Sequence, residues 1–167
     1  MKTLIAYCSS HGCTEKSANE LKNHLGENVE LCNLKKDVAP ELEEFDRVII
    51  GGSIHAGRIQ KKVKDFCKKN LQILRDKEIG LFICCMEEGE GAQRELEMSY
   101  PKELLENAKA CAYFGGEFNF QKMNFLERMI IKKVAHVEET TSNINHTAIR
   151  DFSQKMDRIF NSFLFIA

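Results

Sequence analysis

The sequence contains no tryptophan, two prolines and three tyrosines, and its formal net charge is −1 over 167 residues. A charge so near zero argues against a nucleic-acid-binding protein, because such domains are basic. No segment approaches the ~20 apolar residues of a membrane-spanning helix. The N-terminus enters an apolar segment directly, without the features of a signal peptide. We therefore expect a cytoplasmic protein that binds no nucleic acid.

Cysteine is plentiful but forms no recognisable motif. The seven cysteines, at positions 8, 13, 32, 67, 84, 85 and 111, are odd in number and include no Cys-x-x-Cys pair. This pattern favours reduced thiols over a disulfide framework or a zinc site, and we assign no metal ligand. Cys13 is expected at a helix N-terminus, which lowers the pKa of a thiol. It is therefore either a redox-active thiol or a small loop residue.

Five apolar segments alternate with helical patterns along the chain. The segments are 3–8, 29–34, 46–52, 79–85 and 110–116, and helical patterns cover 14–25, a stretch from near residue 60 and a stretch ending near 107. This alternation predicts an α/β fold in which a parallel sheet has right-handed crossovers and helices on both faces. The chain is long enough for one substantial core. We expect a single domain over 1–167, a doubly wound sandwich around a five-stranded parallel sheet.

The first strand is followed by a short loop of small and hydroxyl-bearing residues. The loop consists of Ser9, Ser10, His11, Gly12, Cys13 and Thr14. A strand, a short loop and a helix N-terminus together bind anions, because the unpaired amides of the first helical turn point at the ligand. Gly12 allows close approach of the backbone or a positive φ. The alternative is an ordinary strand-to-helix turn with a Ser or Thr cap.

Other phosphate-binding loops do not match this sequence. A Walker loop requires Gly-Lys-Ser/Thr, whereas Gly12 is followed by Cys13 and Thr14. A dinucleotide-binding fingerprint requires three spaced glycines. A cysteine phosphatase using Cys8 as nucleophile would need an arginine where Thr14 stands. The loop instead resembles the FMN-phosphate loop of flavodoxins, Ser/Thr-x-Thr-Gly-x-Thr, with His11 in place of a hydroxyl residue.

The resemblance to flavodoxins implies two further loops, after the third and fourth strands, where ligands of such sheets lie. The first of these consists of Ser53, Ile54, His55, Ala56, Gly57 and Arg58, and the second contributes Cys85, Met86, Glu87 and Gly89. By the resemblance, residues 9–14 hold the FMN phosphate and these two loops frame the isoalloxazine ring. We expect ring contacts from Ile54, His55 and Met86. The acidic residues Glu87, Glu88 and Glu90 are expected beside the ring.

About thirty residues, 117–145, separate the fifth strand from the last helix, more than a short-chain flavodoxin has. Within this insertion the sequence predicts a helix with a wide apolar face over 124–134. The chain resembles the flavodoxin-type, quinone-linked protoporphyrinogen IX dehydrogenases in its Met-Lys-Thr-Leu-Ile start, its 46–51 strand followed by Ser53 and Ile54, and its 125–132 run around Arg128. It departs from them at Thr147-Ala148-Ile149, where those enzymes carry Thr-Asp-Trp.

Three roles are open for the insertion: a substrate lid, a peripheral membrane contact through 124–134 at the inner face of the membrane, or packing on the sheet edge or a homodimer contact. None of the three flavin loops lies within it. We therefore expect deletion of 122–143 to leave FMN binding nearly intact. The apolar C-terminal residues Phe160, Phe163, Leu164, Phe165 and Ile166 are expected to complete the core under the last helix.

Three functions are also open. The first is a flavin-dependent oxidoreductase that takes electrons from a small organic substrate and passes them to a quinone or another acceptor. The second is an electron carrier that exchanges electrons with a redox partner protein, and the third is a flavin-binding regulatory domain. In the first two FMN supplies the chemistry, so no side chain is assigned a catalytic role.

Overall fold

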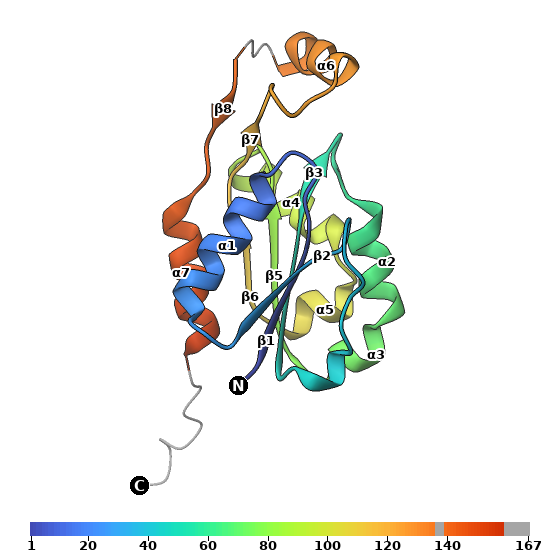
Figure 1. Ribbon diagram of the computed structural model, residues 1–167, viewed down its shortest axis with the longest axis vertical. Coiled ribbons are helices and arrows are strands. Elements are labelled where there is room, and N and C mark those ends of the chain that lie inside the picture. Colours follow the sequence, from blue (N-terminus) through green and yellow to red (C-terminus); the bar gives the residue numbers. More distant parts are fainter. Residues whose placement is uncertain (136–138, 159–167) are drawn as a thin grey trace, which may run out of the picture.

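The computed structural model describes residues 1–135 and 139–158 (Figure 1). The strands are β1 (Thr3–Cys8), β2 (Val29–Asn33), β3 (Arg47–His55), β4 (Arg58–Ile59), β5 (Glu78–Cys84), β6 (Ala108–Tyr113), β7 (Glu117–Phe118) and β8 (Thr141–Ser142). The helices are α1 (Cys13–Leu25), the 3-10 turn η1 (Leu42–Glu44), α2 (Lys61–Lys69), α3 (Leu71–Leu74), α4 (Gly89–Ser99), α5 (Lys102–Asn107), α6 (Phe125–Ala135) and α7 (His146–Asp157). The apolar C-terminal residues Phe160, Phe163, Leu164, Phe165 and Ile166 lie outside the described residues.

The central sheet has the strand order β2-β1-β3-β5-β6, and every pairing along this path is parallel. Helices α1 and α7 cover one face, and α2 to α5 cover the other (Figure 1). Consecutive β1 residues alternate between the two cores, so Leu4 packs with the α2–α5 side and Ile5 with the α1–α7 side. The predicted flavodoxin-like, five-stranded, doubly wound sheet is confirmed.

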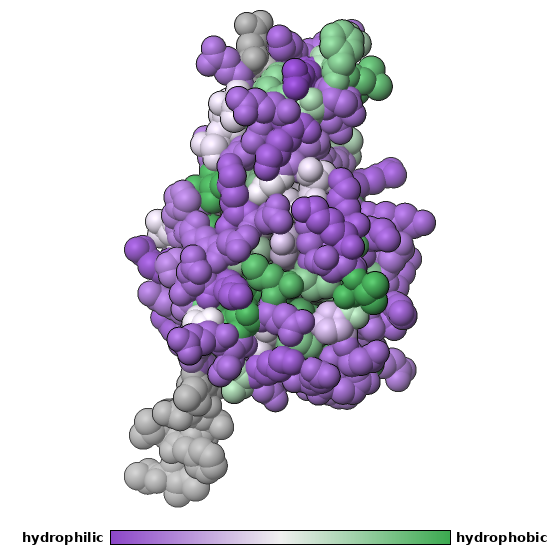
Figure 2. Space-filling view, viewed as in Figure 1, coloured by the Kyte–Doolittle hydropathy of each residue, from purple (hydrophilic) through white to green (hydrophobic). Residues whose placement is uncertain are grey.

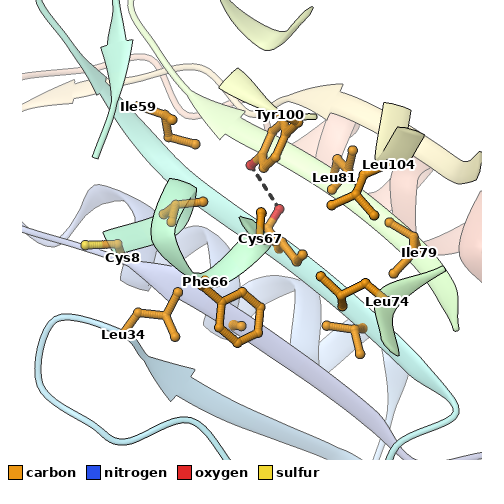
Figure 3. Close-up of a cluster of buried hydrophobic side chains, with 14 of the residues drawn as sticks. Cys8, Leu34, Ile59, Phe66, Cys67, Leu74, Ile79, Leu81, Tyr100 and Leu104 are labelled. Atoms are coloured by element: carbon orange, nitrogen blue, oxygen red, sulfur yellow. Dashed lines mark hydrogen bonds between the residues drawn. The ribbon is translucent and has the colours of Figure 1, made fainter. Parts of the chain in front are cut away.

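The core beneath α2 to α5 contains one buried tyrosine, whose polar group is satisfied within the sheet. Tyr100, 5% exposed, packs among Ile59, Leu81 and Leu104 (Figure 3). Its hydroxyl lies 3.1 Å from the Ile50 carbonyl oxygen and 2.5 Å from that of Phe82. A buried hydroxyl without such partners would be costly, so these contacts allow an aromatic ring to fill this space.

On the opposite face, a phenylalanine ring occupies the space above a glycine of the neighbouring strand. Gly51 on β3 lies opposite Phe82 on β5. A Cβ atom at Gly51 would lie 2.0 Å from Phe82 Cζ. The Phe82 ring stacks on Phe114 at a centroid distance of 4.6 Å and meets Phe152 of α7 edge to face. Gly51 therefore makes room for the three-ring cluster that joins the sheet to α7.

The segment after the third strand differs from the prediction, because residues 53–58 form a hairpin instead of a loop. Strand β3 continues to His55, and β4 pairs antiparallel with its end through Ile54↔Ile59 and His55↔Arg58. Ala56 and Gly57 form the two-residue turn, with φ angles of 48° and 71°. Positive φ at both turn positions matches the twist of the flanking strands, which allows so short a connection.

The insertion is attached to the sheet by a narrow two-stranded neck. Asn145 N donates to Phe114 O at 2.9 Å, Asn143 N donates to Gly116 O at 2.8 Å, and β7 pairs antiparallel with β8. Helix α6 lies beyond this neck, on the side of the molecule where β1 and β3 end (Figure 1). Within residues 1–135 and 139–158, no helix combines the length and apolarity required to cross a membrane.

Candidate functional site

The loop after β1 has the backbone geometry expected of an anion site. Gly12 is the N-cap of α1 and has a φ of 98°. Its amide donates to Ser9 Oγ at 3.2 Å, which fixes the turn. The first hydrogen bond within the helix runs from Lys16 N to Gly12 O. The backbone amides of residues 13–15 therefore have no acceptor within α1. These amides and the positive end of the helix dipole are the groups that bind a phosphate.

The hydroxyl groups of this loop differ in their accessibility. Ser10 is exposed, and Lys35 Nζ donates to its Oγ at 3.3 Å. Thr14 is fully buried, and its Oγ1 lies 3.1 Å from Ser53 Oγ. Gln60 Nε2 donates to the same Ser53 Oγ at 2.9 Å. The Thr14 and Ser53 hydroxyls therefore join the first loop to the β3–β4 hairpin.

A cavity of about 680 Å³ opens beside this loop, at the carboxyl ends of β1, β3 and β5. Ten of the sequence-predicted residues line it: His11, Cys13, Ser53, Ile54, His55, Ala56, Gly57, Cys85, Met86 and Glu87. The other six, Ser9, Ser10, Gly12, Thr14, Arg58 and Gly89, do not line this cavity. The cavity volume is in the range of small-molecule and cofactor sites.

Part of the cavity wall comes from the insertion, which the three-loop prediction did not include. Glu117, Phe118, Met123, Glu127, Ile130 and Ile131 line the cavity. Within α6, Glu127, Ile130 and Ile131 follow the i, i+3, i+4 spacing of one helix face. That spacing was visible in the sequence, but only the neck directs this face towards the cavity. The insertion thus lies over the predicted flavin site and not along the sheet edge.

The acidic residues at the cavity are not those expected. Of Glu87, Glu88 and Glu90, only Glu87 lines the cavity, because Glu88 is the N-cap of α4 and Glu90 lies exposed in its first turn. Glu95, two turns along α4, lines it as well, and burial raises the pKa of its carboxyl. Among the described residues, Glu95 Oε2 is buried without a hydrogen-bond partner. Sequence position did not reveal Glu95, since a helix is needed to bring it to the cavity.

A cluster of His11, His55 and Glu127 joins the first loop, the hairpin and α6. His11 Nε2 lies 3.3 Å from Glu127 Oε2, and the two imidazole rings meet edge to face at 5.8 Å. The Asn124 amide, and then His11, hold the pKa of Glu127 below its usual value. Partial burial and the neighbouring His11 lower the pKa of His55. His11 therefore anchors the insertion as well as belonging to the first loop.

The expectation of a low pKa for Cys13 is wrong. Cys13 is 7% exposed, and the adjacent Cys84 thiol together with burial raises its pKa above the usual value. Burial outweighs the helix dipole at this position because the side chain points into the core beneath α1. All seven cysteines are free thiols, and six of them are buried. Cys111 is exposed although it lies on β6, a position that the apolar strand pattern had not distinguished from the buried ones.

The outward face of α6 is apolar and uncovered by the rest of the described chain. Phe125, Leu126 and Met129, which do not line the cavity, are between 51% and 80% exposed. Figure 2 shows green side chains at this end of the molecule, on an otherwise mainly hydrophilic face. Arg128 donates from Nε to the Met123 carbonyl oxygen at 3.0 Å, which fixes the start of α6. The helix therefore has one face on the cavity and a second, apolar face turned to solvent.

Comparison with known proteins identifies the family. The flavodoxin domain family matches residues 4–145. The chain is 26% identical over 142 residues to the protoporphyrinogen IX dehydrogenase [quinone] of Escherichia coli strain K12, covering 80% of this chain and 78% of the relative. Oxidised flavodoxin 2 from Bacillus cereus superposes with a TM-score of 0.60 at 20% identity, over 93% of this chain and 97% of that one.

A Fusobacterium nucleatum flavodoxin bound to flavin mononucleotide gives a TM-score of 0.51 at 16% identity, over 93% of this chain and 97% of that one. At such identities the solved structures establish the fold alone. The family match extends from β1 through the insertion to the residue before α7, and the sheet has the flavodoxin strand order. This chain belongs to the flavodoxin domain family.

Proposed function

We propose that this protein is an FMN-dependent oxidoreductase that takes electrons from a reduced organic substrate and passes them to a quinone or another acceptor. The observation that carries the proposal is the cavity wall supplied by the insertion, which adds Met123, Ile130 and Ile131 to the space beside the predicted flavin loops. A wall of this kind encloses a small molecule next to the flavin ring. An electron carrier needs only an exposed flavin edge.

The residues present fit FMN. Gly12 carries no Cβ, so a phosphate can approach the amides of residues 13–15. The cavity beside this loop has walls of mixed character, with Ile54 and Met86 offering apolar contacts for a flat ring. FMN, when bound, supplies the electron-transfer chemistry, and the chain supplies binding and electrostatics.

The surrounding side chains would set the properties of the site. Ile131 would cover one side of a bound ring, and the Cys85 thiol, whose pKa burial raises to about 12, remains protonated at neutral pH. The Glu95 carboxyl, with its raised pKa and unpaired Oε2 among the described residues, is available to accept a hydrogen bond from a ring N–H group.

The named relative suggests a substrate class for this chain, a reduced porphyrin-like compound. Glu87, Glu95, Glu117 and Glu127 line the cavity, and carboxylates there oppose the carboxylates of such a substrate. A porphyrinogen would therefore have to direct its carboxylates away from the cavity, towards the basic end of α6 at Lys132 and Lys133. The substrate class rests on the 26% identity.

An electron carrier is the second candidate. It is favoured by the exposed apolar face of α6, with Phe125, Leu126 and Met129, which suits docking on a redox partner or contact with a membrane surface. On this hypothesis the insertion serves recognition and the cavity holds the flavin alone.

Turnover with a quinone distinguishes the two candidates. FMN-loaded protein, reduced anaerobically, should be oxidised by a soluble quinone over many cycles if a small molecule has access to the cavity. Ile131→Phe narrows the cavity from the insertion side and should slow quinone turnover about tenfold, since imprecise positioning of reactants costs at least this much. Leu126→Phe adds the same kind of bulk on the outer part of the helix and should leave turnover unchanged. Equal rates in both variants, or oxidation only by a protein partner, would support the carrier instead.

The position of Glu87 leads to a prediction for the flavin potential. Reduced FMN is an anion near neutral pH, and a carboxylate about 8 Å away opposes it by roughly 1 kcal/mol at an effective dielectric constant of about 40. Glu87→Gln should raise the midpoint potential of the second electron. Glu88→Gln, an identical change outside the cavity, serves as the control and should have a smaller effect. A spectroelectrochemical titration in which both variants shift equally would contradict the prediction.

A further inference from the structure

The insertion brings a positive charge to the first loop. Lys122 lies just before α6, and a Cβ atom at Gly12 would lie 2.7 Å from Lys122 Nζ. The ammonium group therefore lies beside the N-terminus of α1, from a position more than a hundred residues away in the sequence. A cation at the positive end of a helix dipole is unfavourable unless an anion lies between them.

No carboxylate of the described residues forms an ion pair with Lys122. The nearest acidic groups of the insertion have other partners, because Glu127 lies against His11 and Glu117 pairs with Lys16 at 2.7 Å. Lys35 Nζ also reaches this loop, where it donates to Ser10 Oγ at 3.3 Å, and among the residues described it forms no ion pair with a carboxylate. Two ammonium groups thus approach a loop that already presents amides and a helix dipole.

We propose that Lys122 binds the phosphate of the flavin cofactor, together with Lys35, which contacts Ser10 of the same loop. This inference rests on the proposed FMN function and adds to it a pair of phosphate-binding residues, one of which belongs to the insertion. A phosphate monoester dianion at the α1 N-terminus would occupy the position where both ammonium groups lack a counter-charge.

The consequence is that cofactor binding and the position of the insertion are coupled. The phosphate would attach the insertion to the first loop through Lys122, alongside the existing contact between His11 and Glu127. FMN binding would then stabilise the insertion over the cavity, and loss of the insertion would weaken FMN binding. This differs from the expectation, based on the three loops alone, that deleting 122–143 leaves binding nearly intact.

The test measures dissociation constants for FMN and riboflavin by flavin fluorescence at low salt. Wild-type protein should prefer FMN. Lys122→Gln should weaken FMN binding about tenfold, in line with one charge-assisted hydrogen bond, and leave riboflavin binding unchanged. Lys122→Arg should recover most of the affinity, and Lys35→Gln should also reduce FMN binding. Lys69→Gln, the same charge change at an exposed position in the last turn of α2, is the control and should remain within about twofold of wild type.

The outcomes separate this inference from the function on which it rests. If wild-type protein prefers FMN and Lys122→Gln keeps the same ratio of FMN to riboflavin affinity, the role of Lys122 is overturned while the FMN site stands. If Lys122→Gln weakens FMN and riboflavin equally, the lysine does not contact the phosphate. If wild-type protein binds FMN and riboflavin alike, or binds neither, both the phosphate site and the role of Lys122 fail. A weaker dependence of FMN affinity on salt in Lys122→Gln would support a direct charge contact.

Discussion

Replacing Gly12 with valine should lower the affinity for FMN at least about a hundredfold, because several phosphate contacts of 1–3 kcal/mol each are lost together. Gly12 has a φ of 98°, a region that β-branched residues avoid. A side chain at this position would also enter the space between the α1 amides and Lys122 Nζ. The turn would have to rearrange, and the amides would no longer converge on one anion. The measurement is FMN titration of a variant shown to be folded by circular dichroism.

A glycine at the other end of the same helix supplies the matched control. Gly26 has a φ of 93°, and a Cβ built there meets no atom within 4 Å. Gly26→Val therefore carries a similar backbone strain without obstructing any binding group, and it should reduce stability while FMN affinity stays near wild type. Wild-type FMN affinity in a folded Gly12→Val protein would refute the assignment of this loop.

Gly51→Ala should destabilise the protein by about 3 kcal/mol or more, the effect expected of severe overpacking in a closed core. The new methyl group would overlap three atoms of the Phe82 ring, all within 2.3 Å of the ideal Cβ position. Phe82 cannot retreat easily, since it is fully buried and stacks on Phe114. Thermal or urea unfolding of the apoprotein would measure the loss.

A double substitution tests the mechanism of that loss. Phe82→Leu alone removes ring contacts and should also destabilise the protein. In the double variant Gly51→Ala/Phe82→Leu the overlap with the ring is absent, so the total loss should be smaller than the sum of the two single losses. Additive losses would mean that Gly51 matters for some reason other than the ring above it.

The fold could be predicted from the sequence because its main signals are local. The strand at 46–52 is a continuous apolar run, which is typical of a strand buried on both faces, and Gly26 ends the first helix where the pattern stops. The hairpin at 53–58 was harder to identify. Its turn, Ala56 and Gly57, lacks the usual Asn-Gly or Asp-Gly signal, and Ala56 adopts a positive φ that its residue type does not favour.

The candidate site was predictable only where its residues follow strands directly. Cys85, Met86 and Glu87 come straight after β5, so their approximate position follows from the sheet. Glu95 and Ile131 reach the cavity because of the face of α4 and of α6 on which they lie. How these helices are placed, and in α6 how the β7–β8 neck is oriented, depends on contacts between residues far apart in the sequence. Lys122 was missed for the same reason, since its proximity to Gly12 exists only after the insertion has folded back.

The two-stranded neck is also a position at which the chain can accept segments of different length and sequence during evolution. The insertion leaves the domain after Phe114 and returns at Asn145, two positions joined by a backbone hydrogen bond. The entropic cost of closing a loop grows only slowly with its length, so a longer segment between ends that already meet costs little more, and it leaves the register of the parallel sheet untouched. New segments at this point would therefore change what reaches the cavity without requiring a new core. Evolution can thus change which molecules the cavity admits at small risk to folding.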